Sequence, residues 1–318
     1  MTAPHVPVLC EAVTELLERP DGVVVDVTLG AGGHSAALVA RRLQLWGRAA
    51  ILGIDRDESA LLLAREQLAQ ALEDPRVDVQ FVHARADELA RVLDDRGIDQ
   101  VAGVLMDLGV SSMHLDQGAR GFSYRSDGPL DMRMDRTQGV TASSLVNELD
   151  VVALSSLLRR FGEERFARRI AQAIVDARPI ASTAQLAEIV RRSIPAATRR
   201  TGGHPATRTF QALRIAVNDE LASLEAALPI AIERLMEDGV LVVMSYHSLE
   251  DRIVKRVFAS AAAGCTCPPR LAVCACGRTP LVEHVIRRPI GPDAAELRRN
   301  PRSSSVKLRA VRRLAVRA

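Results

Sequence analysis

The sequence has few aromatic side chains and no long apolar run. Only 9 of its 318 residues are Phe, Trp or Tyr, so a core has to be built from Ala, Val, Leu and Ile. No apolar stretch approaches the roughly 18 residues that a membrane-spanning helix needs. The N-terminus has no basic start and Glu11 interrupts it early, which argues against a signal peptide. These absences favour a cytoplasmic protein without a membrane partner.

Cysteine is also scarce, and four of the five cysteines fall within twelve residues, as Cys265-x-Cys267 and Cys274-x-Cys276. This is not the framework of a secreted disulfide-rich domain. Four thiolates could bind zinc, but the C-x-C spacing is tighter than the usual C-x₂-C. Reducible disulfides and free thiols in a surface loop are the alternatives, and we expect no metal at the functional site.

Lysine is almost absent, because the 42 basic residues are 40 Arg and 2 Lys. We attribute this bias to a GC-rich gene and infer no function from it. The formal net charge is only +3, but residues 281–318 carry ten basic and three acidic groups, a net charge of +7. The rest of the chain then carries −4. A positive tail on a slightly negative body indicates either a polyanionic partner or a solvated arginine-rich edge.

The order of apolar patterns predicts an α/β fold of about two domains. Near-continuous apolar strands alternate with amphipathic helices up to residue 113, which favours a parallel sheet buried on both faces. Strands are expected at 23–27, 50–54, 77–82, 101–106, 240–245, 281–287 and 306–314. The simplest organisation is one discontinuous domain, 1–114 with 220–318, and a mostly helical insert at 115–219.

Two details of the helices are predicted as well. Residues 207–236 have a helical period with an interruption near Pro229. Ser248 and Asp251 fit a variant of the capping box at the start of a helix over 249–262.

A glycine-rich turn follows the first strand, with Gly30, Gly32, Gly33 and then His34. Glycine lets a ligand approach the backbone closely, and turns at this place bind nucleotides in doubly wound sheets. The next strand ends at Asp55, where a carboxylate can accept both hydroxyls of a ribose. Together these features predict an adenosine-type ligand, unless Asp55 only caps the following helix.

Two further strand ends carry polar groups. Asp107 ends the fourth strand and is expected to point into the ligand cleft, where its carboxylate could polarise an amine N–H. The alternative is a cap or turn residue. Tyr246 and His247 follow the strand at 240–245 and would face the same cleft, although a lone histidine is more often structural.

Seven strings occur in order over nearly the whole chain. They are HVPVL at 5–9, GAGGH at 30–34, DLGVSS at 107–112, RGFS at 120–123, DGPLDMRMD at 127–135, SYHSLED at 245–251 and NPR at 300–302. As a set they resemble the MraW family of bacterial 16S rRNA cytosine-N4 methyltransferases. The strings at 127–135 and 245–251 are far more specific than the glycine turn.

The resemblance implies a class I, Rossmann-like methyltransferase sheet that depends on S-adenosylmethionine, with an inserted helical substrate-recognition domain. It would methylate N4 of a decoding-centre cytidine, position 1402 of 16S rRNA, in the small ribosomal subunit. Family cofactor contacts fall on Gly32, Gly33, His34, Asp55, Ala86, Asp107 and His114. Ala86 stands where the family commonly has Phe. The oligomeric state, monomer or homodimer, is left open.

For the chemistry we nominate Asp107 as the acceptor of the amine N–H, with Tyr246 or His247 holding the base. Many amino-methyltransferases have a Pro-Pro-aromatic sequence here, which is missing after Asp107. The ring that stacks on the splayed-out base must then be Phe122, Tyr124 or Tyr246. Phosphate contacts are expected from arginines. The candidates are Arg191, Arg192, Arg199, Arg200, Arg287, Arg288, Arg298, Arg299, Arg302 and Arg309.

Three other functions compete with this one. A non-catalytic RNA-binding assembly factor with a relict cofactor pocket is disfavoured by the intact Asp55 and Asp107. An NAD-dependent oxidoreductase is disfavoured because Ser35 replaces the third glycine of G-x-G-x-x-G. A cytosine-N4 DNA methyltransferase shares the chemistry but usually has the Pro-Pro-aromatic sequence.

Overall fold

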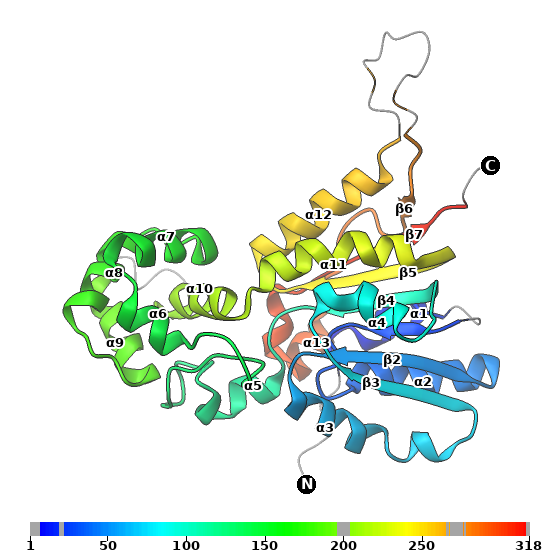
Figure 1. The fold of residues 1–318 in the computed structure, drawn as a ribbon, viewed down its shortest axis with the longest axis horizontal. Helices are drawn as coiled ribbons and strands as arrows, with labels where there is room; N and C mark the ends of the chain where they lie inside the picture. The colour runs from blue at the N-terminus through cyan, green and yellow to red at the C-terminus, as the bar shows by residue number, and fades with distance from the viewer. Residues whose placement is uncertain are drawn as a thin grey trace. The chain divides into compact units, whose positions relative to one another are not determined.

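The computed structural model describes residues 7–18, 22–195, 204–264, 267, 276 and 278–315. The chain forms two compact units, coloured along the chain in Figure 1. One combines Met1–Gly109 with Leu221–Ala318, and the other is Val110–Glu220. None of the helices in these described ranges is long and apolar enough to cross a membrane.

The first unit is built on a seven-stranded sheet with the order β3-β2-β1-β4-β5-β7-β6. The strands are β1 (Val24–Asp26), β2 (Ala49–Asp55), β3 (Val77–His83), β4 (Val101–Asp107), β5 (Leu235–Ser245), β6 (Val282–His284) and β7 (Lys307–Arg313). The first five run parallel, and β7 lies antiparallel between β5 and β6. The predicted parallel sheet is confirmed, with an antiparallel edge that the pattern did not specify.

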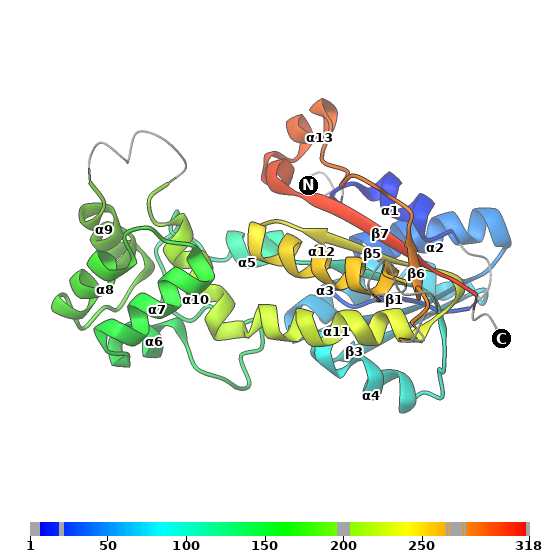
Figure 2. The ribbon, with the colours of Figure 1, turned by 90° about the horizontal axis from the view of Figure 1, so that it is seen from above.

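Both faces of this sheet are covered by helices, as the apolar strand runs predicted. Successive strand residues point to opposite faces, so Val24 packs in one apolar cluster and Val25 in the other. The helices are α1 (Cys10–Leu16), α2 (Gly33–Trp46), α3 (Glu58–Leu68), α4 (Leu89–Asp94), α11 (Glu220–Arg234), α12 (Ser248–Ala262) and α13 (Ala294–Arg299). Helices α1 and α2 cover the Val24 face, and α4, α11 and α12 the Val25 face (Figure 2).

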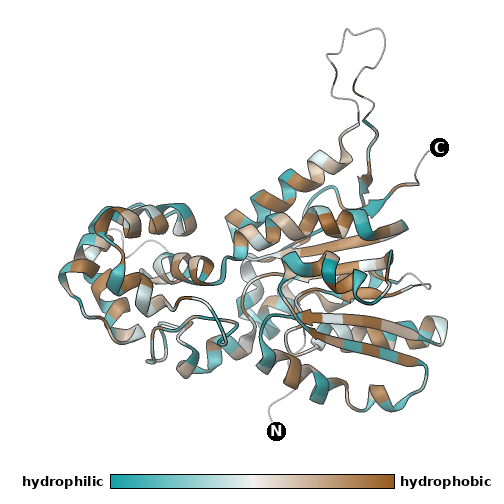
Figure 3. Ribbon diagram, viewed as in Figure 1, coloured by the Kyte–Doolittle hydropathy of each residue, from teal (hydrophilic) through white to brown (hydrophobic). Residues whose placement is uncertain are grey.

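The second unit has a helical core of its own. Its helices are α5 (Ser112–Asp116), α6 (Ala142–Glu148), α7 (Val151–Gly162), α8 (Ala167–Asp176), α9 (Thr183–Ser193) and α10 (Thr207–Asn218). The side chains of Thr141, Asp150 and Ser182 cap α6, α7 and α9. In Figure 3 these helices alternate between apolar and polar residues, and their apolar sides meet in one cluster that includes Leu154, Ile170 and Leu213.

One helix break was predicted at the wrong residue. The helical pattern over 207–236 is interrupted at Asp219, which has a left-handed φ of 50°, and not near Pro229. Aspartate tolerates this conformation better than most residues. Pro229 lies inside α11, where it is exposed. Water can therefore satisfy the carbonyl group that the missing proline N–H leaves without a partner.

Candidate active site

Three neighbouring parallel strands, β2, β1 and β4, all end in aspartate. These residues are Asp55, Asp26 and Asp107. Because parallel strands bring their carboxyl ends to one edge of the sheet, the three acids lie at the edge where open α/β sheets bind ligands. Asp26 is only 1% exposed, and no role was predicted for it from the sequence.

The glycine turn after β1 is tied to the neighbouring strand ends. The Gly30 amide donates to Asp55 Oδ2 at 2.8 Å, and the Asp107 amide donates to Thr28 Oγ1 at 2.6 Å. A Cβ on Gly30 would meet only the Thr28 carbonyl oxygen, at 3.9 Å, so this part of the turn is open to a ligand. Gly32, in contrast, is needed for packing, because its Cβ would lie 3.1 Å from that of Ala64.

Asp107 stands between a phenol and an imidazole. Tyr246 Oη donates to Asp107 Oδ1 at 2.8 Å, and His34 Nε2 lies 3.4 Å from Asp107 Oδ2. The second distance is that of an ion pair rather than of a short hydrogen bond. The Asp107 side chain is 25% exposed and that of His34 only 7%, so the carboxyl group faces the solvent with the imidazole buried behind it. Asp107 and Tyr246 were expected to face one cleft, and the structure brings them into contact.

The electrostatics of this cluster favour a charged His34. Burial alone would lower the pKa of His34, but its interactions with Asp107 and Cys10 and the negative charge of Asp26 raise that pKa to about 10. Burial raises the pKa of Asp26 to about 6, although His34 and the Ser35 hydroxyl oppose this rise. Burial and the nearby Asp107 charge also raise the pKa of Tyr246. Tyr246 is therefore a neutral hydrogen-bond donor at physiological pH.

His247 is the N-cap of α12, and Glu250 completes the cap. The Glu250 amide donates to His247 Nδ1, and Glu250 Oε2 accepts from the Tyr246 amide at 2.8 Å. The predicted capping pair of Ser248 and Asp251 is therefore wrong, because Asp251 binds Lys307 and Arg309 on β7. Glu250 was not among the predicted residues, and its signal was a Glu three residues after the cap. The role of His247 toward a base stays a prediction.

Two further proposed cofactor contacts are Ala86 and His114. Ala86 begins a short turn of helix after β3 and packs against the sheet. His114 lies in α5 of the second unit, is 5% exposed and accepts from the Ser111 amide at 3.2 Å through Nδ1. Its ring is tilted against Phe122 at 4.8 Å. Their cofactor roles stay predictions, as does that of Gly33, whose Cβ would meet Pro7 at 2.7 Å.

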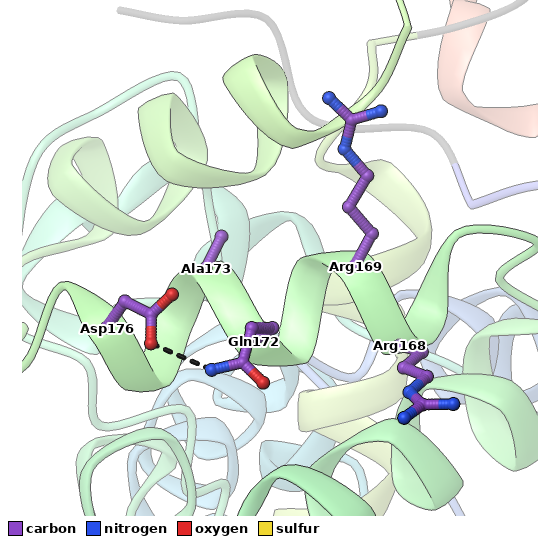
Figure 4. A pocket seen from close by; sticks show the side chains of 5 residues that line it. All are labelled: Arg168, Arg169, Gln172, Ala173 and Asp176. Atoms are coloured by element: carbon purple, nitrogen blue, oxygen red, sulfur yellow. Dashed lines mark hydrogen bonds between the residues drawn. The ribbon is translucent and has the colours of Figure 1, made fainter.

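The structure also separates arginines that pair with an acidic side chain from arginines that do not. Arg191 and Arg192 both pair with Glu188, and Arg309 pairs with Asp251. Arg168 and Arg169 on α8 are exposed, and in the described chain neither has an ion pair. They line a shallow hollow with Gln172, which donates to Asp176 (Figure 4). Arg199, Arg200, Cys265 and Cys274 lie outside the described residues.

The sheet order, the glycine turn and the acidic strand ends define a Rossmann-like α/β domain with its ligand site at the carboxyl ends of the strands. Comparison with known proteins gives the particular family. The model of the MraW methylase family matches residues 2–314, so the chain belongs to this family. Its methyl donor is S-adenosylmethionine.

Two relatives are named ribosomal RNA small subunit methyltransferase H. The one from Symbiobacterium thermophilum is 51% identical over 315 residues, which are 98% of this chain and 96% of the relative. The one from Heliobacterium modesticaldum is 48% identical over 98% of each chain.

The residues at the strand ends fit S-adenosylmethionine. Gly30 leaves room for close approach to the backbone, and Asp55 offers carboxylate oxygens at the place where such sheets bind a ribose. The three acids outweigh the single positive charge of His34, and the remaining negative charge suits a positively charged sulfonium centre.

Proposed function

We propose that this protein transfers a methyl group from S-adenosylmethionine to N4 of a decoding-centre cytidine, position 1402 of 16S rRNA, in the small ribosomal subunit. The observation that carries the proposal is Asp107, a carboxyl group at the end of β4 with Tyr246 on one oxygen and His34 beside the other. The two relatives, whose name is that of a small-subunit rRNA methyltransferase, support the substrate.

The residues that would hold the cofactor are grouped around the turn and the strand ends. Asp55 would accept the ribose hydroxyls, and the backbone at 30–34 would lie along the rest of the ligand. Ala86, Asp107 and His114 complete the proposed set. When bound, the cofactor supplies a methyl group that is already activated by its sulfonium charge. The protein therefore has mainly to position the amine.

Asp107 would act on the nucleophile. Cytosine N4 is a weak nucleophile because its lone pair is delocalised into the ring. A hydrogen bond from N4–H to Asp107 favours a pyramidal nitrogen whose lone pair is free to attack. After transfer the nitrogen carries one proton too many, and the same carboxylate can accept that proton and pass it to the solvent.

Tyr246 would be a positioning residue. Its hydroxyl fixes one Asp107 oxygen, and its own backbone N–H is held by Glu250. The other oxygen lies near His34. Asp107 is thus held from two sides before the base arrives, and this preorganisation is what a positioned acceptor needs. We propose that His247 contributes to holding the base.

The test is methyl transfer to small subunits purified from cells that lack this gene, followed by mass mapping of the methylated nucleosides. We expect one N4-methylated cytidine to appear in the decoding centre with the wild-type protein. The Asp107→Asn variant should bind S-adenosylmethionine but give little product. Methylation at a different atom, or none with wild-type protein, would refute the proposal.

A further inference from the structure

The second unit carries an exposed stack of aromatic rings that the proposed chemistry does not use. The rings of Tyr124 and His204 are stacked, with centroids 4.3 Å apart and planes 9° from parallel. Phe210, which is buried, meets Tyr124 edge-on at 5.6 Å. His204 is exposed and is the outermost of the three. Tyr124 covers one face of its imidazole, and no ring of the described residues covers the other.

Hydrogen bonds hold the outer ring in this position. The Ala206 amide donates to His204 Nδ1 at 3.2 Å, which fixes the plane of the imidazole. The Thr207 hydroxyl donates to the His204 carbonyl at 2.8 Å and lies 3.2 Å from Tyr124 Oη. The stack is therefore held by local hydrogen bonds at the start of α10 and by the contact of Thr207 with Tyr124.

The shape and charge of this surface indicate what it binds. Two exposed arginines adjoin the stack in the chain, Arg125 after Tyr124 and Arg208 after Thr207. Arg208 is directed toward α7 by a hydrogen bond to the Glu163 carbonyl at 2.9 Å. A flat exposed ring is the platform on which unpaired bases of single-stranded RNA stack, and exposed arginines of the same unit attract the RNA backbone.

We propose that the outer face of His204 stacks on an unpaired base of the rRNA substrate. The inference rests on the proposed function and adds a substrate contact to it. Tyr124 was one candidate for the stacking ring of the target base. His204 covers one face of the Tyr124 ring, so the exposed ring face at this end of the stack is that of His204.

The test compares His204→Ala, which removes the ring, with His204→Phe, which keeps a flat ring. Alanine substitution of a ring that stacks on one base costs about 5- to 150-fold in affinity. We expect His204→Ala to raise KM for small subunits within that range with kcat unchanged, because the contact is made equally before and during transfer. His204→Phe should stay close to wild type. His284→Ala is the control, since His284 is an exposed histidine on β6.

The outcomes separate this inference from the proposed function. An inactive wild-type protein would refute the function. An active wild type with the same KM in His204→Ala would refute only the stacking. Equal losses in His204→Ala and His204→Phe, with unchanged melting temperature, would also refute stacking and indicate a role for the ring nitrogens.

A second measurement does not depend on activity. In a Trp46→Phe background, which removes the single tryptophan, His204→Trp places an indole at the proposed contact. Mixed-sequence single-stranded RNA should quench its fluorescence, and a fully paired RNA duplex should quench it much less. His284→Trp is the matched control. Equal quenching at the two positions, or none at 204, would overturn the inference.

Discussion

At the scale of single residues, Asp107 is the group on which the proposed chemistry depends. Asp107→Asn keeps the shape but removes the negative charge that would polarise N4–H and take its proton. We expect kcat to fall about 10²- to 10⁴-fold, while the affinity for S-adenosylmethionine, measured by calorimetry, falls much less because the other cofactor contacts remain. The control is Asp78→Asn on β3, where the acid is exposed. Full activity in Asp107→Asn would remove this residue from the mechanism.

Tyr246→Phe tests whether the phenol acts through Asp107. The variant keeps the ring and loses only the donor to Asp107 Oδ1. We expect about a 10- to 150-fold fall in kcat, which corresponds to the roughly 1.5–3 kcal/mol of a hydrogen bond to a charged group. KM for the subunit should stay the same. A large rise in KM with constant kcat would instead show that Tyr246 binds the base.

His34 makes the stability of the protein depend on pH in a defined direction. Its pKa is about 10 in the folded state and 6.5 ordinarily. Below pH 6.5 both states hold the proton. Between 6.5 and 10 only the folded state holds it, so a rise in pH favours unfolding by up to about 1.4 kcal/mol per pH unit. The stabilisation is lost as pH passes through the folded pKa.

The measurement is urea unfolding of wild type and His34→Gln at pH 7.5, 8.5 and 9.5. We expect the stability advantage of wild type over His34→Gln to shrink at each step. His284→Gln, at an exposed site, should run parallel to wild type. A constant difference between wild type and His34→Gln would show that His34 is not a buried cation.

At the scale of elements, the turn between β1 and α2 can be tested at Gly32, with Gly47, at the other end of α2, as the comparison. Gly32 and Gly47 both have a left-handed φ, of 80° and 67°. An added Cβ would meet Ala64 at 3.1 Å in Gly32→Ala and nothing within 4 Å in Gly47→Ala. Both variants lose about 1–2 kcal/mol for the backbone conformation. Gly32→Ala should lose additional stability, because α3 must shift to make room for the Cβ. Of the two variants, only Gly32→Ala should also weaken binding of S-adenosylmethionine. Thermal melts and calorimetry check this, and equal losses would contradict it.

At the scale of the whole molecule, the arginines without an acidic partner among the described residues are the better candidates for binding phosphates. Arg168→Glu with Arg169→Glu should weaken subunit binding and lower the salt slope by about 0.7–0.9 for each phosphate that is no longer bound. Arg191→Glu with Arg192→Glu changes the net charge equally, but these side chains already pair with Glu188. A filter-binding titration against salt compares the two. A larger effect at 191 and 192 would place the phosphates on α9 instead.

Local patterns in the chain were enough to predict the sheet and the places of Asp55 and Asp107, because strand periodicity and glycine turns are signals that survive without tertiary contacts. They did not show that Asp26, His34, Asp107 and Tyr246 form one charged cluster, since only the parallel sheet brings residues so distant in the chain together. Nor did they separate Glu250 from Asp251 as the cap, or Asp219 from Pro229 as the helix break. Those choices are made by β7, which binds Asp251, and by the solvent around Pro229. Both outcomes depend on contacts with residues distant in the sequence or with solvent, and a sequence pattern contains neither.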